Sequence, residues 1–306
     1  MSRMTMRQPS RWLSALATLL AVLGCAPAAA HGGASDDRID IVVSTDVWAD
    51  VIRSIGGNEV TVTTIIDSST ADPHSYRPTA MDALHVSEAD LVVHNGGGYD
   101  TFMATLAESV GPAEQQTVAA FEAAGHDSGN EHIWYRPDDV ARVATELTRR
   151  LERLHPAGTT DFHTNMHSFL ADLDDIDDRI DRLGATHGST PVLSTSPLAQ
   201  PLITAAQLAN VTPPEFTEAV EADRGIPVLL QHRVSELLAN NEVSVLVHNE
   251  QTSGPVVARL VELAEAAGIP VVGVSETLPE TSEGYLAWFD AQLTEFNRAL
   301  GAHDEP

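Results

Sequence analysis

The sequence predicts an α/β fold of two α/β lobes, each with a largely parallel sheet flanked by helices, joined by one long rigid connector helix. Three observations support this prediction. The chain has 306 residues, enough for two domains of about 150 residues each. Apolar, β-rich runs alternate with helical patterns in two separate cycles, and a long amphipathic helical segment lies between the cycles.

The first cycle of alternation lies in the N-terminal half. Its expected elements are strands at 39–44, 60–66 and 89–94 and helices at 47–55, 79–87 and 138–154. The second cycle starts near Pro191, and its expected elements are strands at 192–194, 243–247 and 271–274 and helices at 202–209, 256–267 and 283–300. Alternation of this kind is typical of βαβ units, which produce parallel sheets.

The connector is expected at about 160–183. Leu173, Ile176 and Ile180 belong to an apolar stripe at three- and four-residue spacing, and the opposite face is rich in Asp. A single long helix between lobes indicates a stiff connection. The predicted organisation is a signal peptide at 1–24, a lipidated Cys and flexible stalk at 25–38, an N-terminal α/β lobe at 39–157, the connector helix at 158–187 and a C-terminal α/β lobe at 188–304.

The N-terminus is typical of a secretory signal peptide. Three Arg precede an apolar run at 12–24 that is too short to span a bilayer stably. The only Cys of the chain, Cys25, follows Val-Leu-Gly, which resembles a bacterial lipobox. Cleavage before Cys25 and lipidation of its thiol would attach the protein to the outside of a membrane. The alternative is ordinary cleavage after Ala30, which would give a soluble periplasmic or secreted protein.

Composition excludes several classes of function. The chain has 17 Arg and no Lys against 44 Asp and Glu, so its formal charge is −27. The absence of Lys excludes a Walker-type phosphate loop and Schiff-base chemistry, and the acidity argues against a nucleic-acid partner. A single Cys excludes an intramolecular disulfide and a Cys-rich zinc module. Beyond the signal peptide, no apolar run is long enough to span a membrane, so a lipid anchor would be the only membrane attachment.

Two His and two Glu occur where parallel sheets usually bind ligands. His74, in Asp-Pro-His-Ser-Tyr-Arg-Pro-Thr, follows the second expected strand, and His132 lies in a loop before the helix at 138–154. Neutral imidazole is the commonest metal-ligating side chain, and two from separate loops would make half of a tetrahedral site. Glu276 follows a strand of the second lobe and is expected to face these loops across a cleft, and Glu250 follows another strand in a similar way; the alternative for either is a surface acid.

These segments resemble a known family. The motif around His74, the run Glu-Ala-Asp-Leu-Val-Val-His-Asn-Gly at 88–96 and His-Ile-Trp at 132–134 are similar to motifs of the metal-binding solute-binding proteins of bacterial ABC transporters, cluster A-I. The C-terminal motifs at 211–216, 249–252 and 276–279 resemble an actinobacterial-type subgroup. The resemblance implies an extracytoplasmic, monomeric binding protein, not an enzyme, that holds one divalent metal between two lobes and delivers it to an ABC permease and its ATPase.

The resemblance also implies ligands. It assigns His74 and His132 in the first lobe and Glu276 in the second. The family places a His or Glu where this chain has Ser196, and a hydroxyl is a poor ligand. The fourth ligand is therefore left open between water, Glu250, Glu131 and none. Two imidazoles with carboxylate favour Zn2+, with Mn2+ as the alternative.

Two other functions fit parts of the sequence. The first is a degenerate or adhesin-like surface protein that keeps the fold with weakened metal binding. The second is a metal-dependent hydrolase, which would use an open coordination position to activate water. The sequence contains no nucleophile-elbow motif that would support the second alternative.

Overall fold

The computed structural model describes residues 38–303 except 68–71, 114–115, 223 and 253. The described residues belong to one compact unit, Asp37–Pro306. The expected signal peptide, Cys25 and nearly all of the expected stalk lie outside the described residues. None of the helices in the described ranges is both long and apolar enough to cross a membrane.

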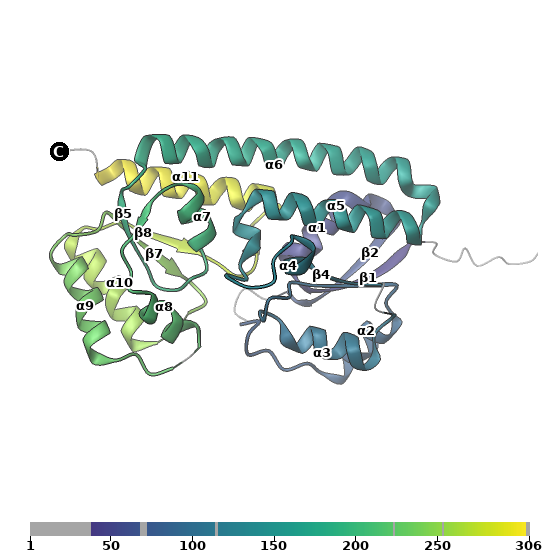
Figure 1. Cartoon of the computed structure of the whole chain (residues 1–306), viewed down its shortest axis with the longest axis horizontal. Coiled ribbons are helices and arrows are strands. Elements are labelled where there is room, and N and C mark those ends of the chain that lie inside the picture. The colour runs from purple at the N-terminus through teal and green to yellow at the C-terminus, as the bar shows by residue number, and fades with distance from the viewer. Residues whose placement is uncertain (1–37, 68–71, 114–115, 223, 253, 304–306) are drawn as a thin grey trace, which may run out of the picture. The chain divides into compact units, whose positions relative to one another are not determined.

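The first lobe contains a four-stranded parallel sheet in the order β2-β1-β3-β4 (Figure 1). Its strands are β1 (Ile39–Thr45), β2 (Val60–Ile66), β3 (Leu91–His94) and β4 (Thr117–Ala119). In the register of the two central strands, Ile41 lies opposite Leu91. Because all four strands run in one direction, the loops that follow them meet at one edge of the sheet.

Helices cover both faces of this sheet. On one face lie α1 (Asp46–Gly56) and α5 (Pro137–Leu154); on the other lie α2 (Ala80–Glu88) and α3 (Thr101–Val110) (Figure 1). Side chains of β1 alternate between the two cores, with Val43 packing toward α1 and Val42 toward α2 and α3. A short helix, α4 (Ala120–Ala123), follows β4.

The second lobe repeats this plan with a parallel sheet in the order β6-β5-β7-β8. Its strands are β5 (Pro191–Ser194), β6 (Ala209–Asn210), β7 (Val245–Asn249) and β8 (Val271–Val274). Its helices are α7 (Gln200–Ala205), α8 (Pro214–Glu221), α9 (Val228–Ala239) and α10 (Pro255–Ala267). Leu193 and Leu246 pack toward α8, α9 and α10, and the opposite face packs on the core shared with the first lobe.

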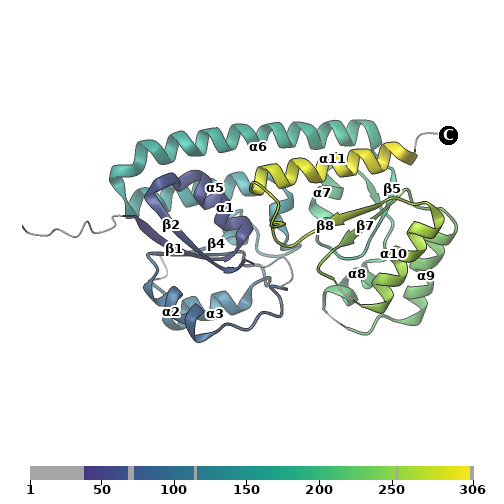
Figure 2. The ribbon, with the colours of Figure 1, turned by 180° about the vertical axis from the view of Figure 1, so that it is seen from behind.

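The connector is α6 (Thr159–His187), a helix of 29 residues. It runs beside the C-terminal helix α11 (Tyr285–His303); in both views α6 extends along both lobes, whereas α11 lies mainly along the second (Figure 1 and Figure 2). Leu173, Ile176 and Ile180 are buried, whereas the Asp-rich face is exposed, as predicted. One apolar core contains residues of both sheets together with this stripe. The predicted fold class is confirmed.

One predicted helix was partly wrong. The pattern at 202–209 predicted a single helix, but α7 ends at Ala205 and Ala209 already belongs to β6. Gln207 has a positive φ of 53°, a conformation that an α-helix cannot contain. The turn at Gln207 therefore ends the helix and directs the chain into the edge strand.

Candidate metal centre

His74 is held by a local turn after β2. The backbone N–H of His74 donates to Oδ1 of Asp72 at 2.9 Å, and Pro73 between them fixes the backbone φ. The imidazole packs edge-on against Tyr99, with ring centroids 4.9 Å apart. The side chain is about a quarter exposed. A fixed turn and an aromatic contact therefore orient this ring.

His132 is fully buried and is oriented by Asn130. Oδ1 of Asn130 accepts the backbone N–H of His132 at 2.9 Å and lies 3.0 Å from its ring Nδ1. The amide orientation is defined because Nδ2 of Asn130 donates to the Pro197 carbonyl at 2.8 Å. An amide oxygen can only accept, so Nδ1 of His132 carries a proton, and in the neutral ring the lone pair lies on Nε2. This is the tautomer that a metal ligand requires.

Two carboxylates face these imidazoles. Oε1 of Glu221, the last residue of α8, lies 3.1 Å from Nε2 of His74 and 3.4 Å from Nε2 of His132. Oε2 of Glu276, in the loop after β8, lies 3.5 Å from Nε2 of His132. The other oxygen of Glu276 accepts a hydrogen bond from Nδ2 of Asn249 at 2.8 Å. One carboxylate thus comes from α8 and the other from the end of a strand in the same lobe.

The four facing atoms are buried and, among the described residues, have no hydrogen-bond partner outside this group. They are Nε2 of His74, Nε2 of His132, Oε1 of Glu221 and Oε2 of Glu276. Buried polar atoms without partners are rare in folded proteins because each loses its hydration without compensation. Two imidazole nitrogens and two carboxylate oxygens directed at one another are the donor set that binds a transition metal.

The charges of the site are strongly coupled. Burial alone would lower the pKa of His74, but the contact with Glu221 outweighs it and raises this pKa to about 9. Burial opposes ionisation of Glu221, yet His132 and His74 together lower its pKa to about 2. The pKa of His132 is raised by Glu276 and Glu221 against the effect of its burial. Burial raises the pKa of Glu276. Without metal, protons on the imidazoles therefore neutralise the carboxylates.

The loop that carries Glu276 is bonded to the first lobe. The hydroxyl of Tyr135 donates to the Ser275 carbonyl at 3.0 Å and accepts the Ser275 N–H at 3.1 Å. The carboxylate of Asp46 accepts the N–H of Leu278 at 3.0 and 3.1 Å. Further bonds between the lobes join Tyr99 to the Glu276 carbonyl, Asp50 to the Tyr285 N–H and the Tyr285 hydroxyl to the Trp134 carbonyl. Glu276 therefore lies in a loop that both lobes hold.

The structure brings together His74, His132 and Glu276 from the predicted set, whereas the side chains of the other two residues have different contacts. Ser196 is buried in the turn after β5, where its hydroxyl accepts the N–H of Leu198 at 3.4 Å and its carbonyl accepts the Ser194 hydroxyl at 2.7 Å. Glu250 is exposed, and its carboxylate lies against Gly273.

Glu221 is the residue that sequence reasoning missed. It lies 25 positions after Ser196, on a helix that was not predicted. The motif Pro-Pro-Glu-Phe at 213–216 is the signal that could have found it, because Pro at the first helical position predicts a helix start. A helix of eight residues from Pro214 ends at Glu221.

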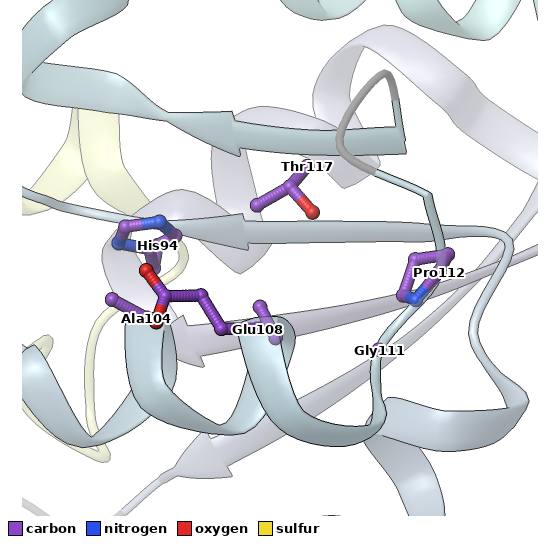
Figure 3. Close-up of a pocket in the computed structure, with 7 residues that line it drawn as sticks. His94, Ala104, Glu108, Gly111, Pro112 and Thr117 are labelled. Atoms are coloured by element: carbon purple, nitrogen blue, oxygen red, sulfur yellow. The ribbon is translucent and has the colours of Figure 1, made fainter.

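Other His lie outside this group. Nε2 of His126 lies 2.9 Å from Oδ2 of the buried Asp139. His94 lines a separate cavity of about 500 Å3 beside α3, where Figure 3 shows its ring close to Glu108. Its Nδ1 lies 3.4 Å from Oδ1 of Asp100. This cavity of the first lobe is therefore separate from the metal-ligand group, to which both lobes contribute.

Comparisons with known proteins identify the family of the chain. The family model described as zinc-uptake complex component A, periplasmic, matches residues 41–299. The manganese-binding lipoprotein MntA of Halalkalibacterium halodurans is 26% identical over 168 residues, which cover 53% of this chain and 56% of that protein. A metal ABC transporter substrate-binding lipoprotein of Lactococcus lactis is 21% identical over 272 residues, 84% of each chain. The match to MntA thus spans little more than half of that relative's length.

Solved structures share the fold. The periplasmic zinc-binding protein TroA from Treponema pallidum superposes with a TM-score of 0.72 at 18% identity, covering 86% of this chain and 99% of that chain. A crystal structure of ZnuA gives a TM-score of 0.71 at 18% identity, covering 87% of this chain and all of the other. At this level of identity the likeness shows the arrangement of two lobes and a connecting helix.

Proposed function

The chain belongs to the family of periplasmic zinc-uptake complex A components, and on that premise we propose that it captures one divalent transition-metal ion between its lobes and delivers it to an ABC importer. Zn2+ is the first candidate for the cargo and Mn2+ the second. The observation that supports capture is the set of four buried, unpartnered ligand atoms on His74, His132, Glu221 and Glu276.

The spacing of these atoms suits a four-coordinate ion. Bonds of about 2.0–2.1 Å at tetrahedral angles place neighbouring ligand atoms about 3.3 Å apart. Nε2 of His74 lies 3.1 Å from Oε1 of Glu221, and Nε2 of His132 lies 3.4 Å from the same oxygen and 3.5 Å from Oε2 of Glu276. Two neutral imidazoles and two carboxylates would also balance the charge of a divalent ion. These three pairs therefore already have the spacing of neighbouring ligands around a tetrahedral ion, and His74 and Glu276 would have to approach each other.

The same geometry argues for binding and against catalysis. A zinc hydrolase keeps one coordination position open for the water that it activates, whereas sites that only hold a metal fill all four positions with protein ligands. His74, His132, Glu221 and Glu276 would fill four positions. A panel of ester and peptide substrates should therefore show no metal-dependent hydrolysis.

The expected partners and location follow from family membership. Relatives are named as substrate-binding lipoproteins of metal ABC transporters. We therefore infer that this chain acts outside the cytoplasm with a permease and its ATPase, held at the membrane by a lipid on Cys25. The expected monomeric state is part of the same proposal.

Metal titration of the purified protein tests the proposed cargo site. One Zn2+ ion per chain should bind and raise the melting temperature, since a ligand that binds only the folded state adds about 4 kcal/mol at a thousandfold excess over Kd. His74→Ala and His132→Ala should each remove most of this shift. His232→Ala, at an exposed position of α9, is the matched control and should retain it.

The proposal would be refuted if the His74→Ala/His132→Ala double variant gained the wild-type shift. A wild-type protein that bound neither metal would favour the surface-protein alternative.

A further inference from the structure

The carboxylate of Glu131 lies beside the four atoms described above. It comes within 4.8 Å of the ligand atoms of His74, His132 and Glu221, which also lie within 4.8 Å of one another. This upper limit exceeds the roughly 3.3 Å between neighbouring ligands of a tetrahedral ion. With metal–oxygen bonds of about 2.2 Å, two ligands on opposite sides of an ion are about 4.4 Å apart. Glu131 therefore has the reach of an additional ligand.

The backbone of Glu131 is fixed, whereas its carboxylate is free. Its carbonyl accepts hydrogen bonds from Nδ2 of Asn95 at 2.9 Å and from the N–H of Ile133 at 2.8 Å. Asn95 is itself held by the indole N–H of Trp48, which donates to its Oδ1 at 3.1 Å. Among the described residues, the Glu131 carboxylate has no hydrogen-bond or ion-pair partner, and its side chain is half-buried. It can turn toward a bound ion without breaking another contact.

We propose that Glu131 is a fifth ligand that binds Mn2+ but is not needed for Zn2+, and so sets the selectivity of the site; this inference rests on the proposed function. Zinc is satisfied by four ligands, whereas manganese favours oxygen ligands and higher coordination numbers. A given site of nitrogen and oxygen ligands otherwise binds Zn2+ more tightly than Mn2+. An extra carboxylate that coordinates only Mn2+ reduces the difference between the affinities for Zn2+ and Mn2+.

Coordination and charge have distinguishable effects. Both ions carry two positive charges, so the electrostatic attraction of Glu131 acts on them equally. A bond from its carboxylate, in contrast, acts only on the ion that expands its coordination. The ratio of the two affinities therefore isolates the ligand role from the charge.

The experiment measures Kd for Zn2+ and for Mn2+ by chelator competition in four proteins. They are the wild type, Glu131→Gln, Glu131→Asp and Asp127→Asn, which removes one charge from an exposed position of the same loop. Glu131→Gln should weaken Mn2+ binding tenfold or more and Zn2+ binding less than threefold. Glu131→Asp keeps the charge but shortens the side chain by one methylene, so it should also lose Mn2+ affinity. Asp127→Asn should change neither.

An unchanged ratio of Kd values in Glu131→Gln or a wild-type ratio in Glu131→Asp would each overturn the inference. These outcomes differ from failure of the proposed function, in which the wild type itself would bind neither ion.

Discussion

Replacing Glu221 with Gln should remove much of the pH dependence of the metal-free protein's stability between about pH 6.5 and 9. In the wild type, contact with Glu221 raises the pKa of His74 from 6.5 to about 9. A group whose pKa is raised by folding contributes stability that is complete below its unfolded pKa and disappears as pH rises through its folded pKa. The contribution of His74 is thus present below about 6.5 and absent above about 9.

The size of the effect follows from the shift. Each pKa unit corresponds to 1.36 kcal/mol, so the change of about 2.5 units in the pKa of His74 amounts to about 3 kcal/mol. The lowered pKa of Glu221, about 2, describes the same pair from the other side and is not added. That contribution is present above about 4.5 and lost as pH falls through 2. The pair therefore stabilises the metal-free protein most between about pH 4.5 and 6.5.

Denaturant unfolding in the presence of a chelator measures this difference. The wild type should lose up to about 3 kcal/mol of unfolding free energy between pH 6 and pH 9, and Glu221→Gln should lose much less. Glu218→Gln, at an exposed position of the same helix, is the matched control and should behave like the wild type. Equal losses in Glu221→Gln and Glu218→Gln would refute the assignment of this pKa shift to Glu221.

Four further predictions follow from the site and its surroundings. Because a pKa of about 9 leaves His74 protonated at pH 7, metal binding should release at least one proton. The binding enthalpy measured by calorimetry should therefore depend on the ionisation enthalpy of the buffer, and a binding enthalpy that is the same in all buffers would contradict this prediction. Cys25→Ala should leave the membrane fraction, and a mature wild-type N-terminus at residue 31 would exclude lipidation. Ser196→His, in a buried turn, should leave the affinity for Zn2+ unchanged or lower it, and Glu250→Gln should leave it unchanged. A tenfold gain of affinity in Ser196→His, or a loss of affinity in Glu250→Gln, would instead show that the residue occupies a ligand position. Burial raises the pKa of Asp46 from 3.8 to about 6, so the charged carboxylate opposes folding above that pH. Asp46→Asn should therefore raise the unfolding free energy at pH 7.5 by up to about 3 kcal/mol. Denaturant unfolding measures this gain, which should vanish below about pH 4.

The positions of most strands and helices could be predicted because periodicity and turn residues lie within a few positions of the elements they define. The strands at 60–66 and 271–274 have the predicted bounds. The strand predicted at 243–247 lies at Val245–Asn249 instead. A short apolar run can slide along the chain without changing its pattern, and only pairing with β5 and β8 determines which residues form the strand.

The two His could be predicted as ligands because each lies in a loop next to an element that the pattern defines. Glu221 could not, because its place depends on how α8 packs. Phe216 on this helix is buried against the second sheet, and that contact directs the end of the helix toward the loops of the first lobe. The direction in which this helix points is set by tertiary packing, which local sequence patterns do not reveal. The local pattern around Glu221 is that of an ordinary exposed helix end.

The four proposed ligand residues differ in which lobe holds them in position. His74 and His132 are fixed by turns of the first lobe, and the loop of Glu276 is bonded to that lobe through Tyr135 and Asp46. Glu221 alone is carried by a helix that packs within the second lobe. Separation of the lobes would therefore withdraw Glu221 first, because fewer hydrogen bonds oppose its movement. Since the same carboxylate contacts both imidazoles, its withdrawal would also allow both rings to exchange metal for solvent.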